Sequence, residues 1–596
     1  MIRYHITSEN PSTHYFNVRI EIDKPDPAGQ NLRLPNWIPG SYMIRDFSRH
    51  LLAMQASSAG QTLLIDQIDK SSWRIEPCAG TLVIEYLVYA YDLSVRGAHL
   101  DHTHGYFNGT SVFMEVVGQG DKPCEVLIEQ PKADYCQTWQ LATTLPRRQG
   151  EGFKFGLFAA ADYDELIDHP VEMGNFQVIH FEACGVPHDV ILTGRYSCDA
   201  TRLAKDLTTI CEHHIRFFGE PAPMAYYQFQ TIVVGDGYGG LEHRASTSLM
   251  CDRDSLPQPG QSKMSGGYRD FLGLCSHEYF HTWNVKRIKP AVYQPYDLRE
   301  EVYTELLWAF EGITSYYDDL ALVRCGLIEA EDYLELLSQT ITRVLRGKGT
   351  TRQSAAESSF NAWTRFYKQD ENAQNAIVSY YAKGCLIALC IDLKMREVTN
   401  SEKCLDDVMR VLWQRWLTSA EGVEVDSIQN LVCHISGVDL NDFMHSLIYQ
   451  TDELPLPDLL KNVGIELKSR VMASQKDRGG KSVEAPLPAV SLGAFFKEQD
   501  GALRILRLDE DGSAMNAGLS AEDSIIAVDG IRLSLDKLEQ KLALANVGDS
   551  WQVHAFRRDE LYEFTVTLLA AKANTVELQC LADQGDRQQS WLGAQH

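Results

Sequence analysis

The sequence predicts a multidomain α+β protein with an N-terminal β domain, a small central sheet followed by a helical body, and a C-terminal β domain. Three observations predict it. The 596 residues exceed what one core normally supports, and the length favours roughly three to four domains. Apolar and polar residues alternate over the N-terminal part, whereas helical spacing dominates from Gly266 to about residue 450. A hydrophobic fraction of 44% with 23% charged residues is typical of ordinary globular domains.

Residues 1–170 are expected to form a β-sandwich. The segments "YFNVRIEID" and "GTLVIEYLVYAYDL" show the alternation of half-buried strands, and strong helical periodicity is missing. Short alternating strands of this kind are typical of two packed sheets.

Residues 171–473 are expected to form the central domain. "FQVIHFEACG", "HDVILTGRY" and "YQFQTIVVGDGYGG" are predicted strands, and "ATRLAKDLTTICEHHIRFFG" is a predicted helix that stops at Gly219. Further helices are expected at the stretch that includes "FLGLCSHEYFH", at "EVYTELLWAFEGITSYYDDLALV" and at "IVSYYAKGCLIALCIDLKMRE".

The polar, glycine-bearing segment 474–486 is the predicted linker. Residues 484–575 are expected to form the C-terminal β domain with a short helix, followed by a polar tail.

The composition excludes several functions. A formal net charge of -26 argues against nucleic acid and anionic membranes as partners, and it mildly favours cationic ligands such as peptide amines. We expect neither a secretion signal nor a membrane span. The 14 cysteines are scattered without a CxxC pattern, which predicts reduced thiols in a cytoplasmic protein, with Cys275 as a buried core residue.

"LCSHEYFHTWN", residues 274–284, holds the most specific motif. On a helix His277 and His281 share one face and can both bind a metal, while Glu278 lies beside a metal-activated water as general base. This HExxH arrangement is typical of zinc peptidases. Because apolar residues surround the motif, both histidines could instead be satisfied core residues.

A catalytic zinc of this kind needs a third protein ligand. The next predicted helix offers Glu300, Glu301, Glu305 and Glu311. The first two lie at its start, where carboxylates are good partners of the helix dipole. Glu305 and Glu311 are six residues apart and cannot face one metal together. Spacing alone does not choose between them.

Two segments resemble motifs of the aminopeptidase N and leukotriene A4 hydrolase group. "LLWAFEGITSYY" is similar to the helix whose Glu before Gly is the third zinc ligand, which implies this role for Glu311. "SYYAKG" resembles the segment whose tyrosine stabilises the oxyanion, which implies this role for Tyr381, with Tyr380 as the neighbour one register away.

A third segment, "GYGGLEHR", resembles the motif whose Glu binds the free α-amine of the substrate. It implies this role for Glu242, with Gly239 and Gly240 allowing the backbone to approach the substrate closely. His243 replaces the usual Asn, and its role is left open. The order of Glu242, the HExxH motif, Glu311 and Tyr381 in the chain matches the group.

A fuller resemblance covers nearly the whole chain. "HEYFHTWNVKRIKP", "LPNWIPGSYMIRDFSRH", "YDLSVRGAHLDHTHGYFNGTSVFM" and the GGLEH segment are similar to the glycyl aminopeptidase family. The resemblance implies a gluzincin with a thermolysin-like α+β domain, one zinc ion and a C-terminal PDZ domain. It also implies peptide substrates with a free N-terminus and a preference for N-terminal glycine or alanine.

The C-terminal segments "SLGAFF" (491–496) and "DGSAMNAGLSAEDSIIAVDGIRL" (511–533) resemble the carboxylate-binding loop and the following helix–strand–turn of PDZ domains. Such a domain binds a peptide C-terminus by adding it to a sheet edge. The alternative, rated equally, is a domain that only packs on the enzyme.

Two further groups of residues attract attention. His99, His102 and His104 could suggest a second metal, but they match the β-domain signature and we expect none there. Arg287 and Lys289 could bind a peptide carbonyl or carboxylate, and a structural role is at least as well supported.

The leading hypothesis is a zinc aminopeptidase. One alternative is a zinc endopeptidase, which would have no use for an amine-binding Glu242. The other is a PDZ-based peptide-binding scaffold with a decayed peptidase domain, which the intact set of catalytic residues disfavours.

Overall fold

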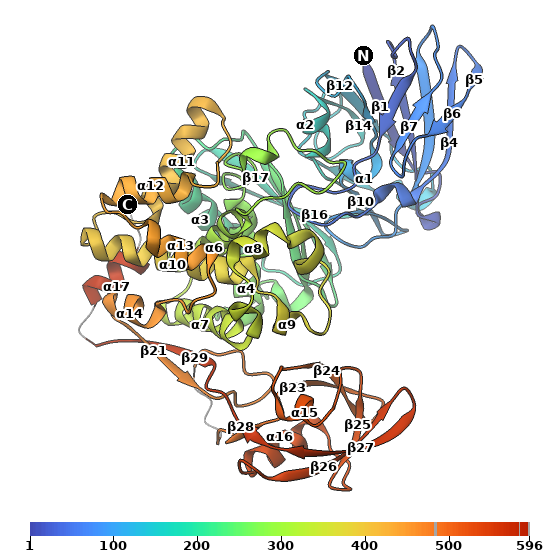
Figure 1. Cartoon of the computed structure of the whole chain (residues 1–596). Coiled ribbons are helices and arrows are strands. Elements are labelled where there is room, and N and C mark those ends of the chain that lie inside the picture. The colour runs from blue at the N-terminus through green and yellow to red at the C-terminus, as the bar shows by residue number, and fades with distance from the viewer. Residues whose placement is uncertain (482–485, 583–584, 594–596) are drawn as a thin grey trace. The chain divides into compact units, whose positions relative to one another are not determined.

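The structure is a computed structural model that describes residues 1–481, 486–582 and 585–593. The chain forms two compact units. Unit 1 comprises Met1–Val302 with Leu412–Val423, and unit 2 comprises Tyr303–Val411 with Glu424–His596. Figure 1 labels many of the elements of both. The predicted domain boundaries remain predictions, because each unit contains more than one predicted domain.

The N-terminal part of unit 1 is rich in β structure, as predicted, and contains three sheets. Their strand orders are β14-β12-β1-β2-β8-β4-β5, β13-β15-β10-β9 and β11-β3-β7-β6. The strands are β1 (Ile2–Thr7), β2 (Tyr15–Ile22), β3 (Gln30–Arg33), β4 (Leu51–Ser58), β5 (Gln61–Leu63), β6 (Ile65–Gln67), β7 (Ser72–Ile75), β8 (Leu82–Tyr89), β9 (Ala98–Leu100), β10 (His104–Phe107), β11 (Glu115–Val116), β12 (Cys124–Ile128), β13 (Gln140–Ala142), β14 (Gly156–Ala160) and β15 (Val171–Gly174). Two short helices, α1 (Gly109–Val112) and α2 (Tyr163–Ile167), interrupt them.

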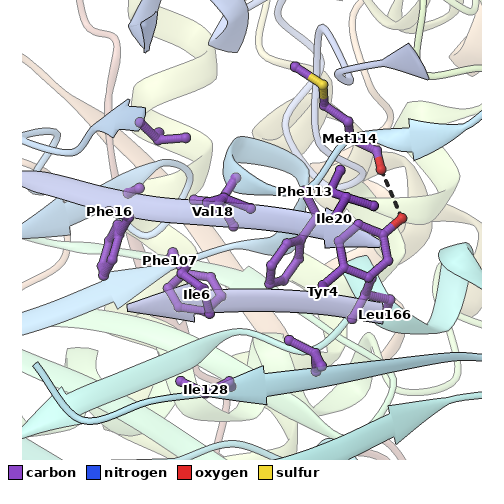
Figure 2. Packing of buried hydrophobic residues seen from close by; sticks show 14 of the residues in the cluster. Tyr4, Ile6, Phe16, Val18, Ile20, Phe107, Phe113, Met114, Ile128 and Leu166 are labelled. Atoms are coloured by element: carbon purple, nitrogen blue, oxygen red, sulfur yellow. Dashed lines mark hydrogen bonds between the residues drawn. The ribbon is translucent and has the colours of Figure 1, made fainter. Parts of the chain in front are cut away.

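Alternation along the strands produces the core of this part. In β2 the side chains of Phe16, Val18 and Ile20 are buried, and the residues between them are more exposed. Figure 2 shows these three side chains in the hydrophobic cluster. Tyr4 from β1 joins the cluster and its hydroxyl donates to the carbonyl oxygen of Met114 at 2.8 Å. A buried tyrosine hydroxyl needs such an acceptor because an unmet one costs roughly 1–3 kcal/mol.

The second part of unit 1 is a mixed five-stranded sheet with two long helices. Its strand order is β16-β17-β18-β20-β19. The bounds are β16 (Gln177–Ala183), β17 (Val186–Gly194), β18 (Tyr227–Val234), β19 (Gly239–Glu242), β20 (Ser246–Asp252), α3 (Ala200–Phe218) and α4 (Gly266–Phe280). The strands β16, β17 and β18 and the helices α3 and α4 match predicted segments, whereas β20 was not predicted and β19 is separate from β18. β19 is the edge strand, and α4 packs against β19 and β20.

Unit 2 begins with a helical body. Its helices are α5 (Leu307–Phe310), α6 (Gly312–Arg324), α7 (Ala330–Arg346), α8 (Ala355–Phe360), α9 (Ala373–Ala376), α10 (Tyr380–Thr399), α12 (Ser427–Ser436), α13 (Asn441–Tyr449) and α14 (Leu456–Asn462). α11 (Leu405–Ser419) contributes residues to both units. The prediction that the helix begins near Glu300 is wrong, since helical structure starts at Leu307. Val302, Tyr303 and Thr304 are poor helix formers, and the Thr304 hydroxyl accepts from the Leu306 amide instead.

The C-terminal part of unit 2 contains a separate β domain with its own hydrophobic cluster. Its main sheet has the order β23-β24-β25-β26-β27. The bounds are β23 (Ala494–Gln499), β24 (Ala502–Leu508), β25 (Ser524–Val528), β26 (Ser550–Arg557), β27 (Glu560–Thr567), α15 (Ser513–Asn516) and α16 (Leu535–Ala543). Two short ladders pair β21 (Ile465–Arg470) with β29 (Thr575–Cys580) and β22 (Val490–Ser491) with β28 (Leu569–Ala570).

The segments on either side of this domain are more ordered than expected. Residues 482–485 of the predicted linker lie outside the described residues, but Asp477 is buried and pairs with Arg470 at 2.5 Å. In the predicted polar tail, α17 (Gly585–Leu592) buries Trp591, whose indole N–H donates to the Tyr316 hydroxyl at 2.9 Å. Leu592 is buried as well, and the Arg324 side chain of α6 donates to the Trp591 carbonyl oxygen, so apolar burial and hydrogen bonds together hold this helix against α6.

Candidate active site

The HExxH motif lies on the last turn of α4. His281 caps this helix, and its amide still donates to the carbonyl of His277 at 3.2 Å. The two imidazoles therefore lie on one helix face, and their Nε2 atoms are 3.0 Å apart. Two nitrogen ligands of a tetrahedral zinc ion at 2.0–2.1 Å are separated by about 3.3 Å, so the pair fits one metal.

A hydrogen bond at Nδ1 fixes the orientation of the His281 ring. Its Nδ1 is 2.6 Å from the carbonyl oxygen of Asn284, which accepts only. Nδ1 must therefore carry the proton and Nε2 must present its lone pair. This is the usual arrangement of a histidine ligand with an outer hydrogen bond, so the donor chemistry of the pair fits zinc.

Two buried histidines from neighbouring elements hold α4 in place. His188 from β17 contacts the Tyr279 hydroxyl at 2.9 Å, and His214 from α3 contacts the Ser276 hydroxyl at 2.9 Å. Burial lowers the pKa of His188 to about 4 and holds the pKa of His214 well below its usual range. Both imidazoles are thus neutral hydrogen-bonding groups near neutral pH.

Two carboxylates lie beside this metal-binding face. Glu242, Glu278 and His281 each place one ligand-type atom within 4.8 Å of the others, and all three are buried. Glu278 comes from α4 and Glu242 from the edge strand β19. A Cβ on Gly240 would overlap the Glu278 carboxylate, so a glycine at this position lets the strand lie directly against it.

Glu242 is 4% exposed, and its Oε1 has no hydrogen-bond partner. A Cβ on Gly40 would lie 2.5 Å from both carboxylate oxygens. Gly40 has a φ of 90°, which glycine adopts without strain. A buried carboxylate oxygen without a donor is costly, so this one indicates a site for a cationic ligand.

A buried cluster of charged side chains surrounds His243 and Arg244, the two residues that follow β19. Asp168 pairs with Lys286 at 2.7 Å and with Arg244 at 3.8 Å. Burial alone raises the pKa of Asp168, but Lys286 and Arg244 outweigh it and hold that pKa well below its usual range. His243 lies 3.8 Å from Asp168, and burial lowers its pKa more than Asp168 raises it. His243 is therefore a neutral member of this cluster.

Unit 2 holds the other predicted site residues. Glu311 is 2% exposed and joins α5 to α6. A Cβ on Gly312 would lie 2.5 Å from the backbone of Gly384, so α6 and α10 cross at a contact between two glycines. That crossing places Glu311 near the start of α10, where its charge is one of the causes that raise the pKa of Tyr380.

The two tyrosines differ in burial. Tyr380 is fully buried, whereas Tyr381 is half-buried and its hydroxyl lies 3.2 Å from that of Tyr367. Glu305, the rival candidate ligand, precedes α5 and lies beside Tyr449, whose pKa is raised first by burial and then by the charge of Glu305.

Cys275, Arg287 and Lys289 lie in buried surroundings that are consistent with structural roles. Cys275 is fully buried, as predicted, and all 14 cysteines are free. Arg287 donates to the carbonyl oxygens of Thr282, Arg244 and Pro223. Burial lowers the pKa of Lys289 to about 7.

The histidines of the β domain have acidic neighbours that the sequence spacing did not reveal. His104 contacts Glu172 at 3.2 Å, and His99 contacts Asp101 at 3.3 Å. His99, Asp101 and His104 lie close enough together to admit a cation. The expectation that no metal binds here stays a prediction.

Sequence reasoning assigned no role to two residues near the site, Gly40 and Arg96. Both lie in segments that carried the family resemblance, but nothing local marks them as site residues. Gly40 covers Glu242, and Arg96 donates to the carbonyl oxygen of Gly240 at 3.1 Å. Both contacts join residues far apart in the chain, so only the folded structure reveals them.

Among the described residues, no helix is both long and apolar enough to cross a membrane.

The M61 N-terminal domain family matches residues 3–175, and the M61 glycyl aminopeptidase family matches residues 270–387. A comparison with functionally curated proteins found no match.

Among solved structures, an aminopeptidase N family protein from Idiomarina loihiensis is 43% identical, with 99% of this chain and 100% of that chain covered and a TM-score of 0.96. Weaker likeness is found to an M1 zinc metallopeptidase from Deinococcus radiodurans (12% identity, 76% and 95% covered, TM-score 0.47). Legionella pneumophila aminopeptidase A in complex with aspartic acid is similarly distant (14% identity, 75% and 49% covered, TM-score 0.47). The family matches and the 43% identity over the full chain show that this protein belongs to the M61 glycyl aminopeptidase family of peptidases.

Proposed function

We propose that the protein is a zinc-dependent aminopeptidase that releases small N-terminal residues, glycine and alanine above all, from peptides. The observation that carries the proposal is the buried Glu242 carboxylate, which has one unpartnered oxygen and places a carboxylate oxygen within 4.8 Å of ligand-type atoms of Glu278 and His281. An ammonium group is the ligand that such a carboxylate needs. It exists beside a scissile bond only at the start of a chain, so the pairing fixes cleavage one residue in.

One zinc ion is proposed, with His277, His281 and Glu311 as protein ligands. The two histidines have the spacing and orientation described above. Glu311 is assigned by its position in the Phe310-Glu311-Gly312 segment and by its burial. A zinc ion held there supplies a Lewis acid that activates water and polarises the scissile carbonyl.

The side chains divide the remaining work. Glu278 removes a proton from the attacking water and delivers it to the leaving amine. Glu242 holds the substrate ammonium, and Gly239 and Gly240 let the substrate backbone lie close to β19. The Tyr381 hydroxyl donates to the oxyanion that develops as water adds to the carbonyl. Its half-buried position, in contrast to that of Tyr380, supports this register.

The preference for small residues has one support besides the family. Gly40 leaves no room between its backbone and the carboxylate that holds the amine. A wall this close to the α-amine limits the space for the first side chain, which favours glycine and alanine.

A peptide panel tests the proposal. Gly-, Ala- and Leu-peptides with free or acetylated N-termini are assayed with the zinc-loaded protein and with Glu242→Ala. Free Gly- and Ala-peptides should be cleaved, acetylated ones should not, and Glu242→Ala should lower kcat/KM on free peptides by about 10- to 150-fold. Equal cleavage of free and acetylated peptides would establish the endopeptidase alternative. Peptide binding without any cleavage would establish the scaffold.

For the C-terminal domain we propose a PDZ-type module. A cavity of about 140 Å³ lies between β23 and α16, the place where such modules bind peptide ends. Gln475 from the preceding segment lines this cavity. Its side-chain oxygen accepts from the backbone N–H of Phe496 at 2.5 Å, and its backbone N–H donates to the Glu539 carboxylate at 2.8 Å. This intramolecular contact favours a packing role over peptide capture.

A further inference from the structure

We propose that Arg96 forms a binding subsite for the C-terminal carboxylate of the substrate, so that di- and tripeptides are the preferred substrates. The inference rests on the proposed aminopeptidase function, and it adds a substrate class to it.

The position of Arg96 is set by the edge strand. Its Nη2 donates to the carbonyl oxygen of Gly240 at 3.1 Å, and a Cβ on Gly239 would lie 3.7 Å from its Nη1. The guanidinium therefore lies beside Gly239 and Gly240, the residues of β19 that precede Glu242. All these groups belong to unit 1.

The loop that carries Arg96 is firmly held against the same sheet. The Val95 carbonyl accepts from Asn108 at 2.9 Å and from the Tyr106 hydroxyl at 3.1 Å. The Tyr106 hydroxyl also lies 2.7 Å from the Ser248 hydroxyl, and Ser248 lies on β20 opposite Leu241. The guanidinium is thus held beside β19 before any ligand binds, which lowers the entropic cost of binding.

The charge of Arg96 is not neutralised within the protein. Among the described residues Arg96 forms no ion pair with a carboxylate, and its Nε is buried without a hydrogen-bond partner. In a chain of net charge -26, an arginine beside the active site without an acidic partner is available for an anionic ligand. Its planar fork of donors suits a carboxylate.

The length of the substrate follows from strand geometry. A peptide held by its ammonium at Glu242 and extended along β19 runs toward Gly240 and then Gly239. Each residue advances about 3.4 Å, so a dipeptide spans about 7 Å and brings its carboxylate level with Gly240. A tripeptide brings it level with Gly239. Arg96 lies at both positions, while the carboxylate of a longer peptide falls beyond it.

The test compares free acids with amides. Gly-Ala, Gly-Ala-Ala and Gly-Ala-Ala-Ala are each assayed with a free C-terminal carboxylate and as the C-terminal amide, using zinc-loaded wild type, Arg96→Gln and Arg96→Lys. For the wild type, kcat/KM should favour the acid over the amide by roughly 10- to 100-fold for the two shorter peptides. For the tetrapeptide the ratio should be near one. Arg96→Gln should bring every ratio near one while cleaving the amides at about the wild-type rate, and Arg96→Lys should keep part of the preference.

Each outcome decides something. Unchanged cleavage of the amides shows that Arg96→Gln is folded and active. If the wild type cleaves acids and amides equally at every length, or if Arg96→Gln slows both to the same extent, the carboxylate subsite is refuted while the aminopeptidase function stands. If the wild type cleaves none of these peptides in either form, the proposed function itself fails.

Discussion

At the scale of single residues, two carboxylates close together carry different chemistry because their surroundings differ. Glu278 lies on the helix of the two histidines, directly against the backbone of Gly240. Glu242 lies on the strand, beneath Gly40, with one oxygen unsatisfied. In the proposed mechanism, the first handles the proton of the attacking water molecule. The second is proposed to receive the positive charge of the substrate ammonium.

Glu278→Gln should retain zinc and lose nearly all turnover. The amide keeps the shape and a hydrogen-bonding oxygen but cannot accept a proton, and loss of a general base typically costs about 10²–10⁴-fold. Metal content and kcat are measured on the same preparation. His277→Ala serves as the contrast, since it should lower the metal content. A zinc-loaded Glu278→Gln protein with near-normal kcat would contradict the assignment.

The third ligand is tested by two glutamates of the same segment. Glu311→Ala should release zinc, because a two-histidine site binds the metal much more weakly than a three-ligand site. Glu305→Ala should retain zinc, since Glu305 lies beside Tyr449. Metal analysis after dialysis, with circular dichroism as a folding control, distinguishes them. The reverse pattern of zinc loss would transfer the role to Glu305.

At the scale of elements, the site depends on how closely the edge strand β19 approaches α4. A glycine at position 240 permits that approach. On its other sides α4 is held by hydrogen bonds from the buried His188 of β17 and His214 of α3. These contacts set the position of Glu278 relative to the substrate strand.

Gly240→Ala should lower kcat by at least about 100-fold in a folded protein. The added methyl group forces the strand and the Glu278 carboxylate apart, and a displacement of about 1 Å at a catalytic group has that effect. Gly266→Ala, at the start of α4, is the control, because its Cβ would meet no atom within 4 Å. Steady-state kinetics on a Gly-peptide amide measures both. Equal losses in the two variants would show that the contact with Glu278 is not the cause.

The buried His188 should make the contact between β17 and α4 sensitive to acid. Burial lowers its pKa to about 4, so between about pH 6.5 and 4 the unfolded chain binds a proton that the folded protein does not. This contribution is fully present above pH 6.5 and is lost as the pH falls toward 4, up to roughly 3 kcal/mol. Thermal unfolding of wild type and His188→Gln is compared at pH 7.5 and 5.0. The destabilisation caused by the substitution should be smaller at pH 5.0, and an equal effect at both pH values would contradict this role.

At the scale of the whole molecule, bound zinc should stabilise the fold as well as enable catalysis. A ligand that binds only the folded chain adds RT ln(1 + [L]/Kd), or about 4 kcal/mol when its concentration is 1,000 times Kd. Removal of the metal with a chelator should therefore abolish cleavage and lower Tm by several degrees, and added zinc should restore both. Full activity after complete removal, verified by metal analysis, would exclude a catalytic metal.

The sequence by itself determined most elements of the central part, because strands and helices there follow local periodicity, as in Ala200–Phe218, but the strand Ser246–Asp252 was not predicted. It also placed His277 and His281 on one helix face, because residues i and i+4 of an α-helix lie on the same face. It misjudged the segment from Glu300 to Leu306, where glutamates and apolar residues resemble a helix but poor helix formers and a threonine side chain prevent one.

Only the tertiary structure decided which distant groups meet. The contact of Gly40 with Glu242, the overlap that a side chain at position 240 would cause with Glu278, and the position of Arg96 at Gly240 all join residues 38 or more positions apart in the chain. Such contacts depend on how sheets and helices pack, and no local periodicity encodes them. The sequence therefore predicted which residue types form the candidate site, whereas tertiary packing decided which backbone segments surround β19.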